Sequence, residues 1–133
     1  MKIVYQGSPG AYSHLAAKKI YPEYEFIPYN TFEDCFKHCN ENEEHKTIIP
    51  VENSIAGRVA DIQYLINKYK LQIYAEHFQE IKHNLIILKD NELKNVKSVR
   101  SHSQAISQCQ KLINSYKFET IIAADTAGSA KYI

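Results

Sequence analysis

The stretch "TIIPVENSIAG", Thr47–Gly57, decides how the first half of this chain is interpreted. An apolar run typical of a buried strand ends at a proline, and Glu52, Asn53 and Ser54 follow before a helical pattern resumes. In parallel α/β sheets, ligands bind outside the carboxyl ends of the strands. These three polar residues are therefore either caps of the following helix, a role that Asn and Ser commonly take, or one wall of a binding site.

The segments around this stretch alternate between short apolar runs and helical patterns. We expect strands at residues 2–5, 24–29 and 46–51, and helices at residues 11–20, 32–40 and 55–69. Thr31, followed by Asp34 three residues later, resembles a helix N-cap. This order of strands and helices predicts an α/β fold with a mainly parallel sheet and right-handed crossovers.

The pattern changes after Lys70. Residues 71–80 and 81–88 are predicted to be two extended segments, which indicates a crossing into a second lobe. Further on we expect a strand at 96–100, a helix at 104–116, a strand at 119–123 and a helix that Asp125 and Thr126 open at Ala127. The prediction is a first lobe at residues 1–75 and a partial second lobe at residues 76–133.

Composition and charge exclude several classes of protein. The 133 residues are 44% hydrophobic and 23% charged, which is typical of a soluble globular domain. A net charge of +1 provides no field for nucleic acid or an anionic membrane, so we expect neither partner. We find no signal-peptide pattern and no apolar run of the roughly 18 residues that a membrane span needs, and we expect a cytoplasmic protein.

The cysteines and histidines do not predict a metal site. Cys35, Cys39 and Cys109 are odd in number and form no CxxC pair, so we expect reduced, structural thiols and neither a disulfide framework nor a zinc site. The other candidate ligands, the histidines, show no metal-ligand spacing on a shared helix face. The prediction is that the protein binds no metal.

Loops rich in glycine and small residues follow the predicted strands. They are "QGSPGAYS" at 6–13, "PVENSIAG" at 50–57, and "SHSQA" at 101–105 with "DTAGSA" at 125–130. Small residues let backbone N–H groups approach an anion, and helix N-termini favour negative charge. A small ligand that carries carboxylates would fit such an arrangement.

Taken one by one, these features also have ordinary structural interpretations. The first loop lacks the GxxxxGK[ST] spacing of a phosphate loop, so alone it indicates a turn. His102, between two serines, fits a hydrogen-bonded loop histidine as well as a base. Gln104 and Gln108 lie four residues apart on one helix face, as many residues on solvated helices do.

The order of the motifs is more specific than any one of them. "QGSPGAYSHLAA" at 6–17, "PVENSIAG" at 50–57, "SHSQAISQC" at 101–109 and "DTAGSA" at 125–130 resemble, in this order, four motifs of the prephenate dehydratase family. The family patterns are G-P-x-G-T-[YF]-S, P-[IV]-E-N-S-x-x-G, S-H-P-Q-A-x-x-Q-C and S-T-A-x-A-A. The positions that depart from these patterns are Ser8, Ala11, Ser103, Asp125 and Ser129.

The resemblance implies a fold, a reaction and a set of site residues. The fold would have two lobes like a type II periplasmic binding protein, with parallel and mixed sheets. The reaction would be the conversion of prephenate to phenylpyruvate, with loss of water and carbon dioxide, in phenylalanine biosynthesis, and it needs no cofactor. The implied catalytic residues are Glu52, Asn53 and Gln108, and the implied substrate-binding residues are Gly10, Ala11, Tyr12, Ser54, Ser101, Gln104, Thr126 and Ala127.

One family feature does not occur in these residues. The family carries a Thr-Arg-Phe motif that supplies a proton-donating threonine and a carboxylate-binding arginine, and this sequence contains no Thr-Arg pair. We therefore expect a truncated chain with an incomplete second lobe and little or no activity. Unpaired sheet edges would favour a homo-oligomer. The alternative hypotheses are an arogenate dehydratase and a non-catalytic small-molecule binding module on the same fold.

Overall fold

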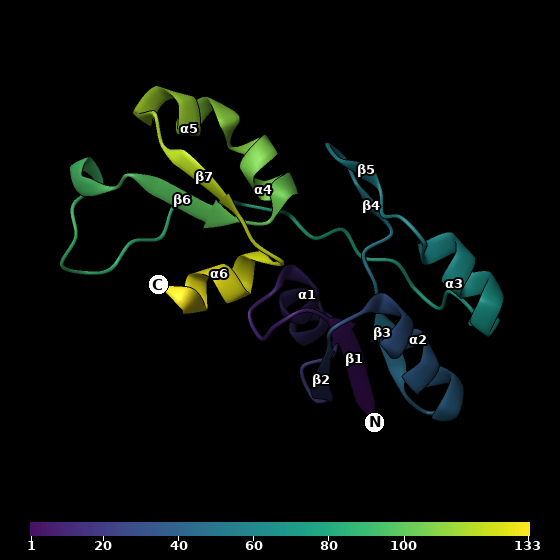
Figure 1. Cartoon of the computed structure of the whole chain (residues 1–133). Helices are drawn as coiled ribbons and strands as arrows, with labels where there is room; N and C mark the ends of the chain where they lie inside the picture. Colours follow the sequence, from purple (N-terminus) through teal and green to yellow (C-terminus); the bar gives the residue numbers. More distant parts are fainter. The chain divides into compact units, whose positions relative to one another are not determined.

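The chain forms two compact units, residues 1–80 and residues 81–133 (Figure 1). The structure, a computed structural model, describes all 133 residues. Its sheets are parallel except for one short antiparallel hairpin, and helices lie between the parallel strands along the chain. The predicted α/β class with parallel and mixed sheets is confirmed.

The first unit is built on a three-stranded parallel sheet. The strands are β1 (Lys2–Gln6), β2 (Glu25–Tyr29) and β3 (Lys46–Ile48), in the order β2-β1-β3. Val4 of the central strand lies in register between Ile27 and Thr47. Because parallel strands are usually covered on both faces, the central one is a continuous apolar run whose middle residues are buried.

Three helices belong to this unit: α1 (Tyr12–Ile20), α2 (Phe32–Glu41) and α3 (Ile62–Tyr69). The predicted N-cap of α2 is confirmed, because the Thr31 hydroxyl accepts a hydrogen bond from the Asp34 N–H at 3.1 Å. Two clusters form the core. Their buried members are Val4, Cys35 and Cys39 in the first cluster and Phe36, Ile62 and Leu65 in the second.

The helix predicted for residues 55–69 is wrong in its first half. Residues 52–58 form a hairpin of β4 (Glu52–Asn53) and β5 (Gly57–Arg58), and α3 begins only at Ile62. The Asn53 side chain explains the difference, because its Oδ1 accepts hydrogen bonds from two successive backbone N–H groups in the turn. The strand expected at 46–51 is also shorter and ends at residue 48.

The second unit contains a two-stranded parallel sheet. The strands are β6 (Ser98–Ser101) and β7 (Glu119–Ile122), and the helices are α4 (Ser103–Gln108), α5 (Gln110–Tyr116) and α6 (Thr126–Tyr132), with a 3-10 turn, η1, at Leu93–Asn95. The single helix predicted for 104–116 is divided at Cys109, whose ψ of 10° departs from helical geometry. Ile106, Ile113 and Phe118 form the core of this unit.

Residues 71–88 contain no helix or strand. The two segments predicted there to be extended have no partner strand, and they include exposed apolar side chains such as Phe78, at 86% exposure. The apolar residues of these two segments therefore do not pair in a β-sheet within this chain. None of the helices combines the length and the apolar character that crossing a bilayer requires.

Candidate functional site

The loop after β1 holds Gly10 in a backbone conformation that favours glycine. Gly10 has a φ of +95°, and its N–H donates a hydrogen bond to Nδ1 of His14 at 2.9 Å. His14 in turn stacks on the Tyr5 ring at a centroid distance of 5.0 Å. Burial, followed by the nearby Lys18, lowers the pKa of His14, so the ring stays a neutral acceptor for this loop.

The two other predicted residues of this loop start the helix that follows. Ala11 is the N-cap of α1 and provides no side-chain cap, and Tyr12 is the first helical residue. The N–H of Ala11 donates to the carbonyl oxygen of Ser8 at 3.0 Å. The loop is thus a hydrogen-bonded turn that leads directly into a helix, as its sequence indicated.

The hairpin after β3 carries the polar trio of the second motif. Glu52 lies in register opposite Arg58, and both line a hollow of about 330 Å³. The remaining lining residues are Val51, Val59, Asp61, Ile62 and Gln63. Ser54 lies in the exposed turn of the hairpin.

Asn53 caps a turn and not a helix. Its Oδ1 accepts hydrogen bonds from the N–H groups of Ile55 and Ala56, both at 2.9 Å. The residue that precedes α3 is Asp61, which makes no side-chain cap. The interpretation of Glu52 and Asn53 as helix caps is therefore wrong, and the Nδ2 group of Asn53 is left to donate elsewhere.

In the second unit, the third motif lies at the start of α4. Ser101 is the last residue of β6, and Nδ1 of His102 accepts a hydrogen bond from the Gln104 N–H at 3.3 Å as the N-cap of α4. Gln108 is half-buried, and its Oε1 lies 2.9 Å from Nε2 of His83. His102 is thus a hydrogen-bonded loop histidine, which was one of its two interpretations. Gln108 contacts His83 and is not simply a solvated helix residue.

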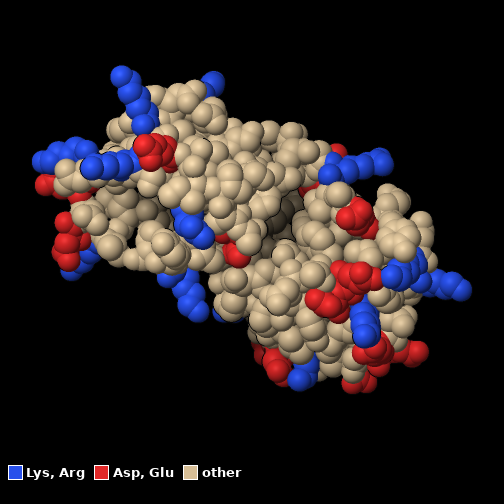
Figure 2. Space-filling model, viewed as in Figure 1, with Lys and Arg blue, Asp and Glu red and all other residues tan.

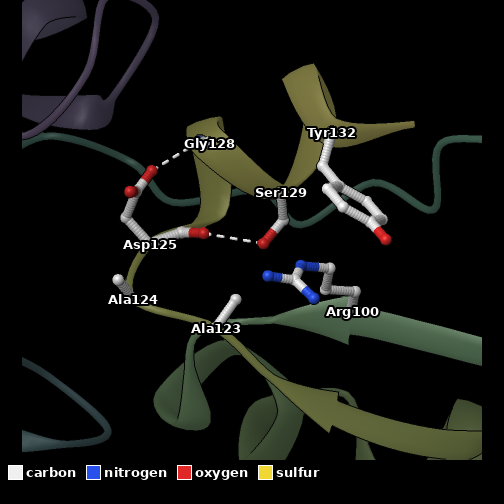
Figure 3. Close-up of a pocket in the computed structure, with 7 residues that line it drawn as sticks. All are labelled: Arg100, Ala123, Ala124, Asp125, Gly128, Ser129 and Tyr132. Carbon is white, nitrogen blue, oxygen red and sulfur yellow. Dashed lines mark hydrogen bonds between the residues drawn. The ribbon is translucent and has the colours of Figure 1, made fainter.

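The fourth motif forms the start of α6. Asp125 is the N-cap, its carboxylate accepts from the Gly128 N–H, and the Ser129 hydroxyl donates to the Asp125 carbonyl oxygen at 2.8 Å (Figure 3). A Cβ on Gly128 would lie only 2.9 Å from the Asp125 carboxylate, so a larger residue here would displace the capping carboxylate. Thr126 and Ala127, the predicted binding residues, are half-buried in the first turn.

A second hollow, of about 220 Å³, lies beside this helix. In Figure 3, the Arg100 side chain rises from β6 toward α6, and its guanidinium carbon lies 4.4 Å from the centroid of the Tyr132 ring. The other lining residues are Ala123, Ala124, Asp125, Gly128 and Ser129. Thr126 and Ala127 do not line this hollow.

The sequence prediction did not single out the two arginines that line these hollows. Arg58 and Arg100 are the only arginines of the chain, and each lines one of the two hollows. Their positions, one residue after the second motif and one before the third, could have singled them out. The wider charge distribution adds no such signal, since Figure 2 shows acidic and basic side chains interspersed on the visible face.

No group of three or more His, Cys, Asp or Glu side chains is placed to hold a metal ion. The three cysteines are free. Burial raises the pKa of Cys35 to about 12 and that of Cys39 to about 11. Both thiols therefore stay protonated and poorly reactive at neutral pH.

The chain matches one protein-family model over nearly its whole length. The family model of prephenate dehydratase matches residues 3–133. The chain belongs to the prephenate dehydratase family. The resemblance drawn from the four ordered motifs is thereby confirmed, and the match includes every residue predicted to belong to the site.

Individual members of the prephenate dehydratase family carry more than one activity in their names. The chain is 32% identical over 131 residues to a bifunctional N-acyl-homoserine lactone acylase/prephenate dehydratase of Komagataeibacter europaeus, covering 98% of the chain and 47% of that protein. It is 33% identical over 133 residues to arogenate dehydratase 2 of Petunia hybrida, covering 100% of the chain and 34% of that protein. The chain thus spans half or less of the length of these relatives.

Solved structures of similar proteins support the fold. A structure titled as GqqA, a novel type of quorum quenching acylase, superimposes with a TM-score of 0.84 at 32% identity, over 96% of the chain and 47% of that protein. A prephenate dehydratase from Staphylococcus aureus superimposes with a TM-score of 0.72 at 22% identity, over 100% of the chain and 51% of that protein. The chain therefore has the periplasmic-binding-like fold of that dehydratase, as predicted.

Proposed function

We propose that this chain provides substrate-binding walls of a dehydratase that converts prephenate to phenylpyruvate, water and carbon dioxide. The observation that carries the proposal is the family match over residues 3–133, within which all four motifs occur in order. Residues 1–75 and 76–133 are the two lobes in this proposal. The reaction belongs to phenylalanine biosynthesis, and it proceeds without a cofactor or a metal.

The chemistry needs positioning and one acid. A proton reaches the ring hydroxyl, the C–O bond breaks to release water, and the C–C bond to the ring carboxylate breaks to release carbon dioxide. The electron pair of that C–C bond enters the ring, which becomes aromatic. Because aromatisation drives the reaction, a site can act largely by holding the substrate in the reactive geometry.

The hairpin supplies the polar groups of the first wall. Glu52 lines the hollow, and Nδ2 of Asn53 is directed by the two hydrogen bonds that Oδ1 accepts. Ser54 adds a hydroxyl in the exposed turn. We assign Glu52 and Asn53 to catalysis and Ser54 to binding, with the loop residues Gly10, Ala11 and Tyr12 as further binding residues.

The second unit contains the remaining site residues of this proposal. Gln108 is the catalytic member, and the binding residues are Ser101, Gln104, Thr126 and Ala127. Ser101 ends a strand, while Gln104 and Thr126 each lie in the first turn of a helix. All are at carboxyl ends of parallel strands or in the helices directly after them, where α/β proteins bind ligands.

The test is turnover and binding of prephenate by the 133-residue chain. We expect prephenate to bind and the Asn53→Ala variant to bind at least about tenfold more weakly, because hydrogen bonds to a charged substrate contribute about 1.5–3 kcal/mol each. Asn40→Ala, an exposed change on α2, is the matched control and should bind normally. Unchanged binding by Asn53→Ala would contradict the assignment.

The same experiment separates the alternatives. Formation of phenylpyruvate would exclude a non-catalytic binding module, whereas binding without turnover fits both that module and a dehydratase chain that lacks the Thr-Arg-Phe motif. Arogenate, in place of prephenate, tests the activity named for the petunia relative. Faster turnover or tighter binding of arogenate would assign the chain to an arogenate dehydratase.

A second candidate function follows from the 0.84 TM-score to the structure titled as a quorum quenching acylase. The relative from Komagataeibacter europaeus is named for both acylase and dehydratase activity. The candidate is therefore hydrolysis of the amide bond of N-acyl-homoserine lactones. Release of homoserine lactone by the chain would support it, and release that continues in Glu52→Gln would place that activity outside the hairpin hollow.

We further propose that the protein is a homo-oligomer and that it is located in the cytoplasm. All four residues of β7 are exposed, including Ile121 and Ile122, and an uncovered strand favours pairing with another chain. Light scattering at high concentration should detect a dimer or larger species, and a monomer would contradict the proposal. Five Arabidopsis relatives are named as chloroplastic, so fractionation of cells is the test of location.

A further inference from the structure

We propose that Arg58 binds a carboxylate of the substrate in the hollow of the β4–β5 hairpin. The inference rests on the proposed function and adds the charge partner that a dicarboxylate substrate requires. It concerns a residue outside the four motifs, since Arg58 follows directly after "PVENSIAG".

The hairpin fixes the position of Arg58. Its backbone is in register opposite Glu52, and the next residue, Val59, donates its N–H to the Val51 carbonyl oxygen at 3.0 Å. Gly57, at a φ of +80°, completes the turn before it. The side chains of Arg58 and Glu52 therefore line the same hollow from opposite strands.

Arg58 is the only cation that lines this hollow. The other charged lining residues are the acids Glu52 and Asp61. An anionic ligand placed beside two carboxylates would be repelled unless a positive charge balanced them. The Arg58 guanidinium can supply that charge and can hold a carboxylate through two parallel N–H donors.

The guanidinium of Arg58 has no side-chain partner in the structure. It forms no salt bridge, no side-chain hydrogen bond and no contact with an aromatic ring. The other arginine, Arg100, lies over the Tyr132 ring, and Lys68 is paired with Glu33 at 2.6 Å. Of these cations, Arg58 alone is unpaired and lines a hollow.

The substrate class fits this arrangement. Prephenate and arogenate both carry two carboxylates, whereas phenylpyruvate carries one. A carboxylate held by the Arg58 guanidinium would leave the rest of the ligand beside Glu52 and Gln63, which line the same hollow. The ring hydroxyl and the second carboxylate are the groups that remain to be held by other residues.

The experiment is a calorimetric titration of the 133-residue chain with prephenate, using Arg58→Gln, Arg58→Lys and the control Lys19→Gln. Lys19 is an exposed cation on α1, so its variant has the same change of net charge. We expect Arg58→Gln to bind prephenate at least about tenfold more weakly than the wild type. Arg58→Lys should lose affinity to an intermediate degree, and Lys19→Gln should bind as the wild type does. Higher salt should reduce the difference between wild type and Arg58→Gln.

The outcomes separate the inference from the proposed function. Wild-type binding of prephenate with equal binding by Arg58→Gln overturns the role of Arg58 and leaves the dehydratase proposal standing. If the wild-type chain neither binds prephenate nor forms phenylpyruvate, the proposed function fails and the inference fails with it. Circular dichroism of the exposed-site variants confirms that a lost interaction, and not a lost fold, is measured.

Discussion

The two units complete their parallel sheets to different degrees. In the first unit, β1 has a strand on each side, and Ile3, Val4 and Tyr5 are exposed to only 1%, 0% and 1%. In the second unit, β7 has one partner and all four of its residues are exposed. Since parallel strands gain stability from burial on both faces, most of the packing energy within these residues belongs to the first unit.

The largest expected effect is the loss of a core side chain from the first unit. Ile62 is 1% exposed and packs with Phe36 and Leu65. Ile62→Ala should lower the free energy of unfolding by about 2–5 kcal/mol through the lost burial and the cavity. Ile122→Ala, at a β7 position that is 61% exposed, should change it by less than about 0.5 kcal/mol.

Denaturant titration followed by far-UV circular dichroism measures both changes. Similar losses for the two variants would mean that β7 is covered in solution, for example in the proposed oligomer. The difference in strand burial between the two units would then apply to the isolated chain and not to the oligomer.

The parts of the fold that could be predicted from sequence are those in which local chemistry and burial agree. β1 to β3 and the Thr31 cap of α2 follow from apolar runs and one side-chain hydrogen bond. The hairpin at 52–58 could not be predicted in this way, because the apolar spacing of the stretch fits a helix. There, Asn53 satisfies two backbone N–H groups and Gly57 takes a positive φ, which stabilise a turn.

The candidate site was predicted from motif order, and physical reasoning alone did not reach it. The ordinary interpretations remained correct for His102, which caps α4, and for the first loop, which is a hydrogen-bonded turn. Arg58 directly follows the second motif along the chain, but its place opposite Glu52 depends on strand register. A two-residue strand carries too little periodicity to predict such a register.

The cysteines provide a second comparison between the units, with a smaller expected effect. Burial raises the pKa of Cys35 to about 12 and that of Cys39 to about 11, whereas Cys109 of the second unit is only half-buried. Since the thiolate is the reactive form, a disulfide reagent at pH 8 should modify Cys109 first and the other two at least about a hundredfold more slowly. Cys109→Ser should remove the fast phase, and a fast phase that remains would show that the first unit opens.

Two glycines, one in each unit, would be destabilised by a Cβ for different reasons, one through its backbone conformation and the other through a close contact. Gly10 of the first unit has a φ of +95° and free space where a Cβ would be, whereas Gly128 of the second has ordinary φ but a Cβ that would lie 2.9 Å from the Asp125 carboxylate. Gly10→Ala should cost about 1–2 kcal/mol from the backbone alone. Gly128→Ala should cost about 1 kcal/mol by displacing the cap of α6.

Hydrogen exchange distinguishes the two glycine variants. Gly10→Ala should increase exchange at the start of α1, and Gly128→Ala should increase it within α6 only. A Gly128→Ala chain with unchanged protection in α6 would contradict the assignment of Asp125 as the cap that holds this helix.

The smallest expected effect is a pH dependence that arises at His38 in the first unit. Nδ1 of His38 lies 2.9 Å from the Tyr29 hydroxyl, and its Nε2 lies 2.8 Å from Nδ1 of His45. Burial, followed by the adjacent His45, lowers the pKa of His38 below 6.5, with Lys2 adding to this direction and Glu41 opposing it.

The sign of the effect follows from that lowered pKa. The unfolded chain binds a proton at His38 near pH 6.5, whereas the folded chain resists it, so the stabilisation is complete above pH 6.5 and is lost as the pH falls toward the folded-state pKa. Denaturant midpoints at pH 7.5 and 5.5 should therefore differ more for wild type than for His38→Gln, which has no proton to gain there. Equal pH dependence in both proteins would mean that the remaining groups, His14 among them because burial also lowers its pKa, account for the whole change.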